Sequence, residues 1–560
     1  MLDQTTLDTL LTHAKQNGCE ISDGIEFRID PSTGVGGYIT KVIPEHHKPL
    51  IKIPKDFIIT RNDAMRHFKS NRCSSSNPNA ITQMYLIALR NSNSTKWQPY
   101  LNILPSLDNI SSPLIWKHNE LEVLRGSDLY IKSKRKLKDL LDEWYTVLKE
   151  LDLCNTAATE YYQLQDRENI VIQESYAIDS FAAYLWASLI FSSRAFPSLV
   201  YDSAATFNEA FLFPIVDLLN HSDDSKVFWR FAESFLTFTS EESLKVGDEL
   251  YNNYGSKSNE DLLLGYGFAH DPNPYDLTSI SLKLDDHTIK SAQEYGIEMD
   301  LNSISGDSIR FDISTQDPLP LKLIMFFGYI SKLKSERDIT VRAVVEGLGQ
   351  LQAILAQKVS IFKEKSKFAP NTYDITDPLI IKNAKTYLTA QRKLFHLSED
   401  TLVKKVKAII KVFKPLSFKS IFKAEHEFAN SLQLSLGISN YEELVSKGLT
   451  QHALLLWIVK IHNFNPLKKS PAYSFVYRAF GDVKNNIKIE KDDVMEYMNF
   501  YKTFFPTLSL KFPKIYGVGS WSISDFIVAG VVMDRLVWLR KSNSDYLFFE
   551  KQSFDGKMFA

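Results

Sequence analysis

FPIVDLLNHS, residues 213–222, is an apolar run that ends abruptly in two polar side chains, Asn220 and His221. A second segment, GDELYNNYGSKSNEDLLLGYGF, residues 247–268, begins as a strand-like run, passes through a polar turn and ends in a helical, aromatic-rich pattern. Together they predict a buried strand, a hairpin and an aromatic turn. Such an arrangement suits a pocket with a few convergent polar groups.

The composition of the chain is that of a large globular protein. It has 560 residues, of which 44% are apolar and 24% charged, so more than one domain is expected. The formal net charge of -2 gives no general field that would attract nucleic acid or a membrane. Cys19, Cys73 and Cys154 are widely spaced and form no disulfide framework or zinc set. This pattern predicts a reducing compartment, the cytoplasm first and the nucleus second.

The N-terminal residues 1–18 predict an amphipathic helix and no secretory signal. Leu7, Leu10, Leu11 and Ala14 recur at helical spacing, and Gly18 follows them. Acidic residues appear early and no apolar core of a signal peptide is present. Since no stretch reaches the ~18 apolar residues that span a bilayer, we expect no membrane segment. We also expect a monomer.

Two further blocks carry polar or glycine residues inside apolar patterns. In STGVGGYIT, residues 32–40, glycines allow close backbone approach and positive φ, although a plain hairpin turn is the alternative. FAAYLWASLIFSSRAF, residues 181–196, predicts a buried helix with Arg194 near its end. A buried arginine needs a partner, for which Asp217 is the candidate; the alternative is an exposed arginine near the helix dipole.

These blocks resemble the SET-domain protein-lysine methyltransferases. More narrowly, they are similar to the branch typified by the Rubisco large-subunit methyltransferase, and within it to fungal ribosomal-protein and elongation-factor lysine methyltransferases. KPLIKIPKDFIIT, residues 48–60, resembles the strand that follows the glycine turn in that family. The blocks occur in family order and span about half the chain.

The resemblance implies an α+β fold: a β-rich SET core with a helical insertion, followed by a mostly α-helical C-terminal substrate-binding domain. We expect the first part of the core in residues 1–60, the insertion in 61–180, the main core in 181–274 and the helical domain in 275–560.

The resemblance also implies S-adenosyl-L-methionine as cofactor and Tyr254 as the catalytic residue. The implied cofactor-binding residues are Thr33, Val35, Arg194, Asn220, His221, Tyr254 and Phe268. The implied lysine-channel residues are Phe196, Asp217, Asn252 and Tyr266. Asn252 departs from the family, which often has an apolar residue there. No metal site is expected, because His221 has no ligand partners at metal spacing.

The chemistry of methyl transfer explains these residue types. The attacking amine must be neutral, whereas free lysine has a pKa of about 10.4. A positive sulfonium and an apolar channel both disfavour the ammonium form. Aromatic walls attract a methylammonium cation, and alignment of the reactants supplies much of the rate. Tyr254 is therefore expected to orient the amine and not to act as a nucleophile.

The C-terminal half reads as helical. A helical stripe is formed by Val341, Val344, Leu348, Leu351, Leu355, Val359 and Phe362. Residues 401–424 carry seven lysines and one predicted buried face, formed by Val403, Val406, Ile410 and Phe413. A solvated helix surface is one interpretation of these lysines; a docking surface for an acidic partner or ribosomal RNA is the other. The lysines are Lys404, Lys405, Lys407, Lys411, Lys414, Lys419 and Lys423.

The predicted function is methylation of a protein lysine in the translation apparatus. A large-subunit ribosomal protein is the first expected substrate and elongation factor 1-alpha the second. Cytochrome c is a rival substrate, and a SET-like adaptor without turnover is a rival from another class.

Overall fold

The computed structural model describes residues 3–30, 33–45, 48–70, 77–92, 96–154, 157–165, 170, 172–299, 304–305, 308–463, 470–516 and 521–556. Cys73 lies outside the described residues. The chain forms two compact units. The first comprises Met1–Thr278, Ser314–Gln316 and Ile361–Lys393, and the second comprises Ser279–Ile313, Asp317–Ser360 and Leu394–Ala560.

The first unit contains small antiparallel sheets, two of which join a pair of consecutive strands to strands from elsewhere in the chain. One sheet has the order β1-β4-β8-β7 and another the order β2-β3-β9. Apolar residues such as Ile51, Ile53 and Phe238 are fully buried where β4 pairs with β8. The strands are β1 (Glu20–Ile21), β2 (Ile25–Asp30), β3 (Gly34–Ile39), β4 (Ile51–Pro54), β7 (Val227–Ala232), β8 (Phe235–Ser240) and β9 (Glu249–Leu250).

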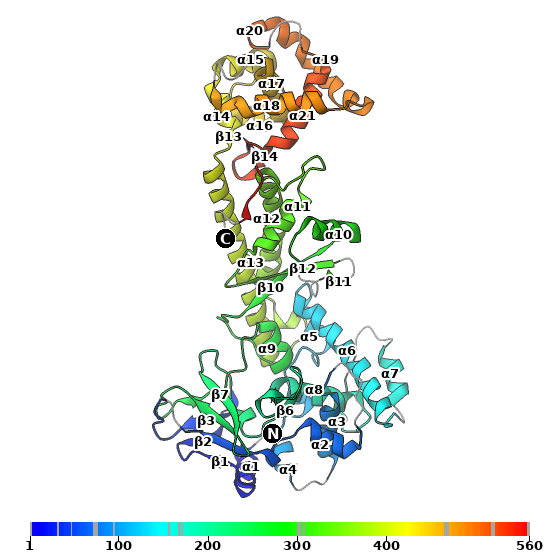
Figure 1. The fold of residues 1–560 in the computed structure, drawn as a ribbon, viewed down its shortest axis with the longest axis vertical. Coiled ribbons are helices and arrows are strands. Elements are labelled where there is room, and N and C mark those ends of the chain that lie inside the picture. The colour runs from blue at the N-terminus through cyan, green and yellow to red at the C-terminus, as the bar shows by residue number, and fades with distance from the viewer. Residues whose placement is uncertain are drawn as a thin grey trace. The chain divides into compact units, whose positions relative to one another are not determined.

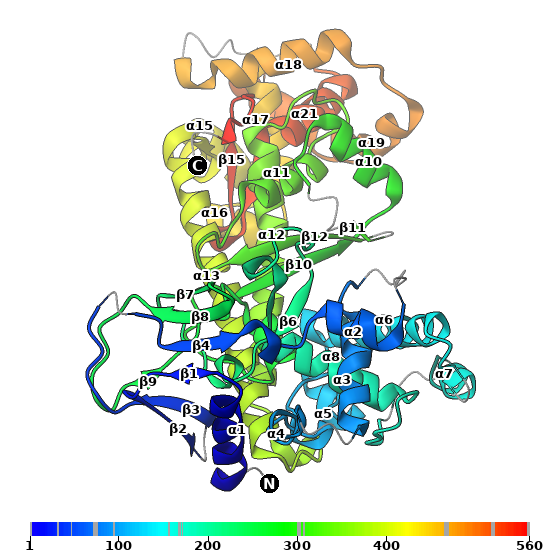
Figure 2. The ribbon, with the colours of Figure 1, turned by 60° about the horizontal axis from the view of Figure 1, so that its bottom comes forward.

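Helices of the first unit gather on one side of these strands, as Figures 1 and 2 both show. The N-terminal helix α1 (Gln4–Gln16) forms as predicted, with Leu7, Leu10 and Ala14 buried and Gly18 at a φ of +83°. The segment 61–180 is helical over most of its described residues. Its longer helices, followed by the buried helix, are α2 (Arg61–Phe68), α3 (Ala80–Asn91), α6 (Asp128–Glu150), α7 (Ala157–Gln165) and α8 (Phe181–Arg194).

Three local predictions differ from the structure. The glycines Gly36 and Gly37 lie inside β3 and not in a turn, because Gly37 pairs with both Phe27 and Leu250. Phe196 lies in a strand, β5 (Ala195–Pro197), because it pairs with β6 (Ala210–Leu212) and so ends the helix at Arg194.

The segment 213–222 is not a strand as predicted. It forms a 3-10 turn, η5 (Val216–Leu218), preceded by Ile215 at a φ of +75°. A β-branched residue at positive φ cannot continue a strand, and such strained backbone is concentrated at functional sites.

The second unit is mainly helical. Helices α17 (Thr450–Asn463), α18 (Ser474–Asn486) and α19 (Lys491–Lys511) surround α21 (Ile523–Leu536) in Figure 1. It also holds two three-stranded sheets, with the orders β10-β12-β11 and β13-β15-β14. Their strands are β10 (Leu277–Lys283), β11 (Ile304–Ser305), β12 (Ser308–Ser314), β13 (Leu416–Ser417), β14 (Val537–Arg540) and β15 (Asp545–Phe548).

Helix α12 (Val341–Lys365) follows the predicted apolar stripe, and α13 (Pro378–Phe413) ends before Pro415 as expected. The buried face predicted near the end of α13 is wrong by about one position. Leu402 and Ile409 are fully buried, whereas Val403 and Ile410 are half-buried. The described helices include none that is both long and apolar enough to cross a bilayer.

Candidate active site

The two segments that carry the strongest sequence pattern lie side by side. The backbone N–H of Asn252 donates to the carbonyl of Asn220 at 2.7 Å, and that of Ser222 donates to the carbonyl of Asn252 at 3.0 Å. His221 and Asn252 thereby form an isolated parallel bridge. This pairing places the polar end of the first segment against the tyrosine turn of the second.

An aromatic stack lies next to this bridge. The ring of Tyr254 lies parallel to that of His221, with centroids 4.8 Å apart, and to that of Tyr266, 4.7 Å away. Phe268 lies at the edge of the stack, 6.5 Å from His221 and 6.3 Å from Tyr266. The structure thus brings together four residues that were predicted separately.

The hydroxyl of Tyr254 donates to the backbone carbonyl of Leu219 at 2.9 Å. Because its hydrogen is committed to that carbonyl, its oxygen lone pairs remain available as acceptors. Burial raises the pKa of Tyr254 well above its usual range and that of Tyr266 to about 12. Both side chains therefore act as neutral phenols near pH 7.

The ring of His221 has a defined tautomer. Its Nδ1 accepts the backbone N–H of Tyr254 at 3.1 Å, so Nδ1 carries no hydrogen and Nε2 does. That Nε2 lies 3.0 Å from Oδ1 of Asp223. Burial lowers the pKa of His221, and the Asp223 carboxylate opposes this effect. Because the effect of burial is the larger one, the ring stays neutral.

The predicted pairing of Arg194 with Asp217 is present. Nη1 of Arg194 donates to the carbonyl of Asp217 at 3.0 Å and lies 3.4 Å from its Oδ2. Tyr100, from the helical insertion, donates its hydroxyl to the same Oδ2 at 2.7 Å. Burial raises the pKa of Asp217, and the Arg194 charge opposes this.

Asn220 lies close to residues of β3 and β9. Nδ2 of Asn220 donates to Oε1 of Glu249 at 2.7 Å. A Cβ on Gly36 would lie 2.8 Å from that oxygen, so a larger residue here would displace the Glu249 carboxylate. Thr33 and Val35 lie at the start of the same hairpin, where the backbone N–H of Thr33 donates to Asp30 at 3.2 Å.

Two predicted channel residues do not join the stack through the described contacts. Phe196 lies in a separate aromatic cluster, with ring centroids 5.2 Å from Phe213 and 5.0 Å from Trp229. The side chain of Asn252 is buried and its Oδ1 accepts the backbone N–H of Asn253 at 2.9 Å.

Sequence reasoning missed several residues that hold the site. Tyr100 and Glu249 contact Asp217 and Asn220, and Asp223 contacts His221. Asn383 of α13 donates to the carbonyl of Gly267 at 2.8 Å and accepts the N–H of Ala269 at 3.4 Å, so it brackets Phe268. Asp223 directly follows the first quoted segment and Glu249 lies inside the second, whereas Tyr100 and Asn383 are distant from both and carried no local signal.

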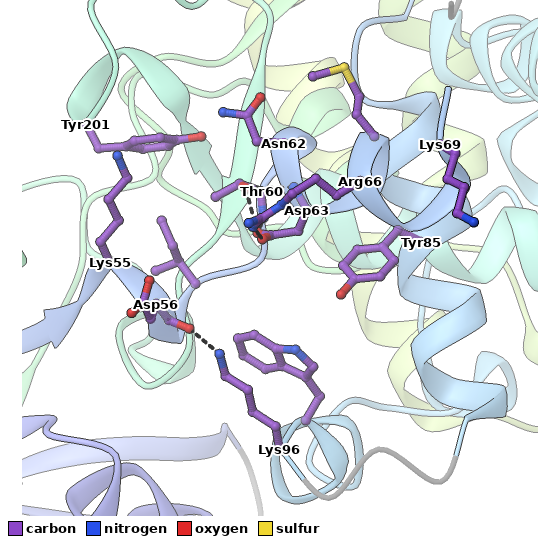
Figure 3. A pocket seen from close by; sticks show the side chains of 13 residues that line it. Lys55, Asp56, Thr60, Asn62, Asp63, Arg66, Lys69, Tyr85, Lys96 and Tyr201 are labelled. Carbon is purple, nitrogen blue, oxygen red and sulfur yellow. Dashed lines mark hydrogen bonds and ion pairs between the residues drawn. The ribbon is translucent and has the colours of Figure 1, made fainter. Parts of the chain in front are cut away.

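A cavity of about 980 Å³ lies elsewhere in the first unit (Figure 3). Lysine and arginine side chains surround it, but Nζ of Lys96 donates to the Asp56 carbonyl at 2.6 Å and Arg66 is paired with Asp63. The residues described as lining it include none of the predicted site residues. This cavity is therefore separate from the stack around Tyr254.

Comparison with known proteins shows what this fold is similar to. Solved structures of the SET domain of Rubisco LSMT are similar in fold: the form bound to lysine and AdoHcy has a TM-score of 0.54 at 17% identity, covering 73% of this chain and 94% of that one. A family model described as the EFM1 middle domain matches residues 277–413. The fold of this chain is therefore that of a SET domain.

Full-length relatives narrow the class. Protein-lysine N-methyltransferase EFM1 of Saccharomyces cerevisiae is 37% identical, over 99% of this chain and 100% of that protein. Ribosomal lysine N-methyltransferase 1 of the same yeast is 26% identical, over 87% of this chain and 91% of that protein. The chain belongs to the SET-domain protein-lysine N-methyltransferases of the Rubisco LSMT-like branch. It is an enzyme that uses S-adenosyl-L-methionine to methylate a protein lysine.

The described residues fit that cofactor. An amino acid carboxylate needs cationic or N–H donors. Arg194 and Asn220 are donors of this kind, and here they bond Asp217 and Glu249. The absence of a side chain at Gly36 keeps open the backbone approach beside Glu249.

Proposed function

We propose that methyl transfer takes place against the hydroxyl of Tyr254. The observation that carries this proposal is the hydrogen bond from that hydroxyl to the Leu219 carbonyl, at 2.9 Å. It fixes the phenol as an acceptor toward the channel. The stacked rings of His221 and Tyr266 restrict the phenol on both faces.

When bound, the cofactor supplies a methyl group on a positively charged sulfonium. The lone pairs of Tyr254 orient the incoming amine and stabilise the positive charge beside it. Tyr266 and Phe268 exclude water and provide aromatic faces for a methylated ammonium. Because the phenol of Tyr254 stays protonated, it does not remove the proton of the amine, which must leave to water first.

We assign cofactor binding to Arg194, Asn220 and His221, with backbone contacts at Thr33 and Val35. Arg194 faces the cofactor carboxylate and stays oriented because Asp217 and Tyr100 hold it. In this proposal Asp217 positions Arg194 and does not line the lysine channel. The placement of Phe196 and Asn252 in that channel stays a prediction.

For the substrate, we propose a protein of the translation apparatus, with elongation factor 1-alpha ahead of a large-subunit ribosomal protein. This order reverses the one expected from sequence. This chain is 37% identical to EFM1 but only 26% identical to Ribosomal lysine N-methyltransferase 1, and the second match also covers less of this chain. A substrate shared with the ribosomal enzymes is accordingly less expected.

The C-terminal helical half is proposed to select the substrate. Lys404, Lys407 and Lys411 are exposed on α13. Lys419 differs from these three lysines because it forms an ion pair within the protein: its Nζ lies 2.7 Å from Oε1 of Glu442. A protein substrate with an acidic face, or RNA bound to it, would contact the first three lysines.

The test is single-turnover transfer of labelled methyl to purified elongation factor 1-alpha, to large ribosomal subunits and to cytochrome c. A mass shift on one lysine identifies the substrate. Labelling of ribosomal subunits with no labelling of the factor would overturn the proposed order. Absence of any labelled band, also in a lysate lacking this protein, would favour the non-catalytic adaptor.

A further inference from the structure

Asp223 lies between two imidazole rings beside the catalytic stack. Its Oδ1 is 3.0 Å from Nε2 of His221, and its Oδ2 is 3.3 Å from Nε2 of His270. The side chain of Asp223 is 13% exposed and that of His221 only 3%, so this is not a surface carboxylate.

The backbone around Asp223 is held from the tyrosine turn itself. Nδ2 of Asn253 donates to the carbonyls of Asp223 at 3.2 Å and Ser225 at 3.1 Å, and its Oδ1 accepts the N–H of Gly255 at 2.8 Å. The carboxylate and Tyr254 therefore belong to one hydrogen-bonded loop. His270 is oriented separately, because its Nδ1 lies 3.1 Å from the Pro272 carbonyl.

We propose that Asp223 is a positioning residue that fixes the tautomer of His221 and, through it, the place of Tyr254. The carboxylate accepts the Nε2 hydrogen, which leaves the Nδ1 lone pair to accept the N–H of Tyr254 at 3.1 Å. The opposite tautomer would set N–H against N–H at Tyr254. Asp223 touches neither reacting group in this account; it acts through the ring that stacks on Tyr254.

The same three side chains invite a second interpretation, a divalent cation site, because ligand atoms of His221, Asp223 and His270 lie within 4.8 Å of one another. A metal on Nε2 of His221 requires a lone pair there. Nδ1 uses its own lone pair to accept the N–H of Tyr254, so the ring hydrogen is on Nε2. Nε2 therefore has no lone pair for a metal. The geometry favours the positioning role.

The experiment compares Asp223→Ala with Asp223→Asn, using exposed Asp224→Ala as the matched control. An asparagine oxygen can still accept the Nε2 hydrogen, whereas alanine cannot. We expect Asp223→Ala to weaken binding of S-adenosylhomocysteine about tenfold or more and to slow single-turnover transfer. Asp223→Asn should stay within about threefold of wild type in both measurements, and Asp224→Ala should match wild type.

Nitrogen-15 NMR of labelled histidines, assigned with His221→Gln, gives a readout that a loss of stability does not mimic. We expect the Nε2–H tautomer in wild type and Asp223→Asn, and its loss in folded Asp223→Ala. The proposal is overturned if Asp223→Ala equals Asp224→Ala, or if Asp223→Asn is as impaired as Asp223→Ala. It is also overturned if calorimetry with Zn²⁺ shows binding that Asp223→Asn abolishes.

This inference rests on the proposed role of Tyr254, and Tyr254→Phe separates the two. If Tyr254→Phe transfers methyl normally, the proposed site fails. If Tyr254→Phe is inactive while Asp223→Ala behaves as Asp224→Ala, the positioning role of Asp223 alone fails.

Discussion

The phenol of Tyr254 and the backbone carbonyl of Leu219 are joined by a 2.9 Å hydrogen bond, although 35 residues separate them in sequence. Because the backbone fixes the position of the carbonyl, this bond holds the hydroxyl hydrogen in one direction. The preorganised acceptor that results costs no rearrangement when the amine approaches.

Tyr254→Phe should therefore reduce single-turnover methyl transfer by about 10²–10³, with cofactor affinity nearly unchanged. The substitution keeps the ring and its stack but removes the acceptor. Tyr266→Phe is the control and should cost less, or change how many methyl groups are added. Retention of more than about a tenth of wild-type turnover by Tyr254→Phe would remove it from the catalytic role.

Asn220→Ala should weaken S-adenosylhomocysteine binding by about tenfold or more. It removes the amide that now bonds Oε1 of Glu249 at 2.7 Å and that the proposed site offers to the cofactor; loss of one hydrogen bond to a charged group costs about 1.5–3 kcal/mol. Calorimetry on the folded variant measures this. Unchanged affinity would exclude Asn220 from the cofactor site.

Asn383→Ala should lower both the free energy of unfolding and cofactor affinity. The change strips partners from the buried Gly267 carbonyl and Ala269 N–H, at about 1–3 kcal/mol for each group. These groups flank Phe268, so its ring would lose its fixed place. Urea unfolding and calorimetry give the two values, with exposed Lys382→Ala as the neighbouring control. Loss of stability alone would show that Asn383 does not act on the site.

Replacing Lys404, Lys407 and Lys411 together with glutamine should raise KM for the protein substrate several-fold and leave cofactor affinity intact. Lys419→Gln is a matched control, since Glu442 already partners that lysine. The effect should shrink at high salt. If KM does not move, the three lysines form a solvated surface.

Cofactor affinity should be constant above about pH 6.5 and fall as the solution becomes more acidic. Burial lowers the pKa of His221 from its ordinary value of 6.5, so the folded site favours the neutral ring. For the stability of the fold, that preference contributes fully above the unfolded pKa and is lost as pH falls through the folded one. Cofactor affinity should fall over the same acidic range, because a protonated ring can no longer accept the N–H of Tyr254. Asp223→Asn removes the opposing charge and should shift the decline to lower pH. A decline that Asp223→Asn leaves unchanged or shifts to higher pH would contradict this assignment.

The fold class and the main features of the site were readable from sequence because they depend on local patterns. The spacing of Leu7, Leu10 and Ala14 required a helix, and the stripe from Val341 to Phe362 required another. The polar pair Asn220 and His221 at the end of an apolar run, and the tyrosine turn at Tyr254, indicated the two segments that the fold brings together.

Local geometry was less readable where the chain departs from regular structure. A positive φ at Ile215 replaced the expected strand with a 3-10 turn, and sheet pairing drew Gly36 and Gly37 into β3. These outcomes depend on partners that come from other parts of the chain, so apolar periodicity alone does not encode them.

The sequence by itself determined which residue types stand near one another along the chain, and hence the family and its cofactor. Only the tertiary structure decided that Tyr100 supports Asp217, that Asn383 brackets Phe268 and that Asp223 accepts the hydrogen of His221. The reason is physical: a buried polar group must find a partner, but any donor or acceptor that folding brings within about 3 Å can satisfy it. Which one does so is fixed by how distant segments pack.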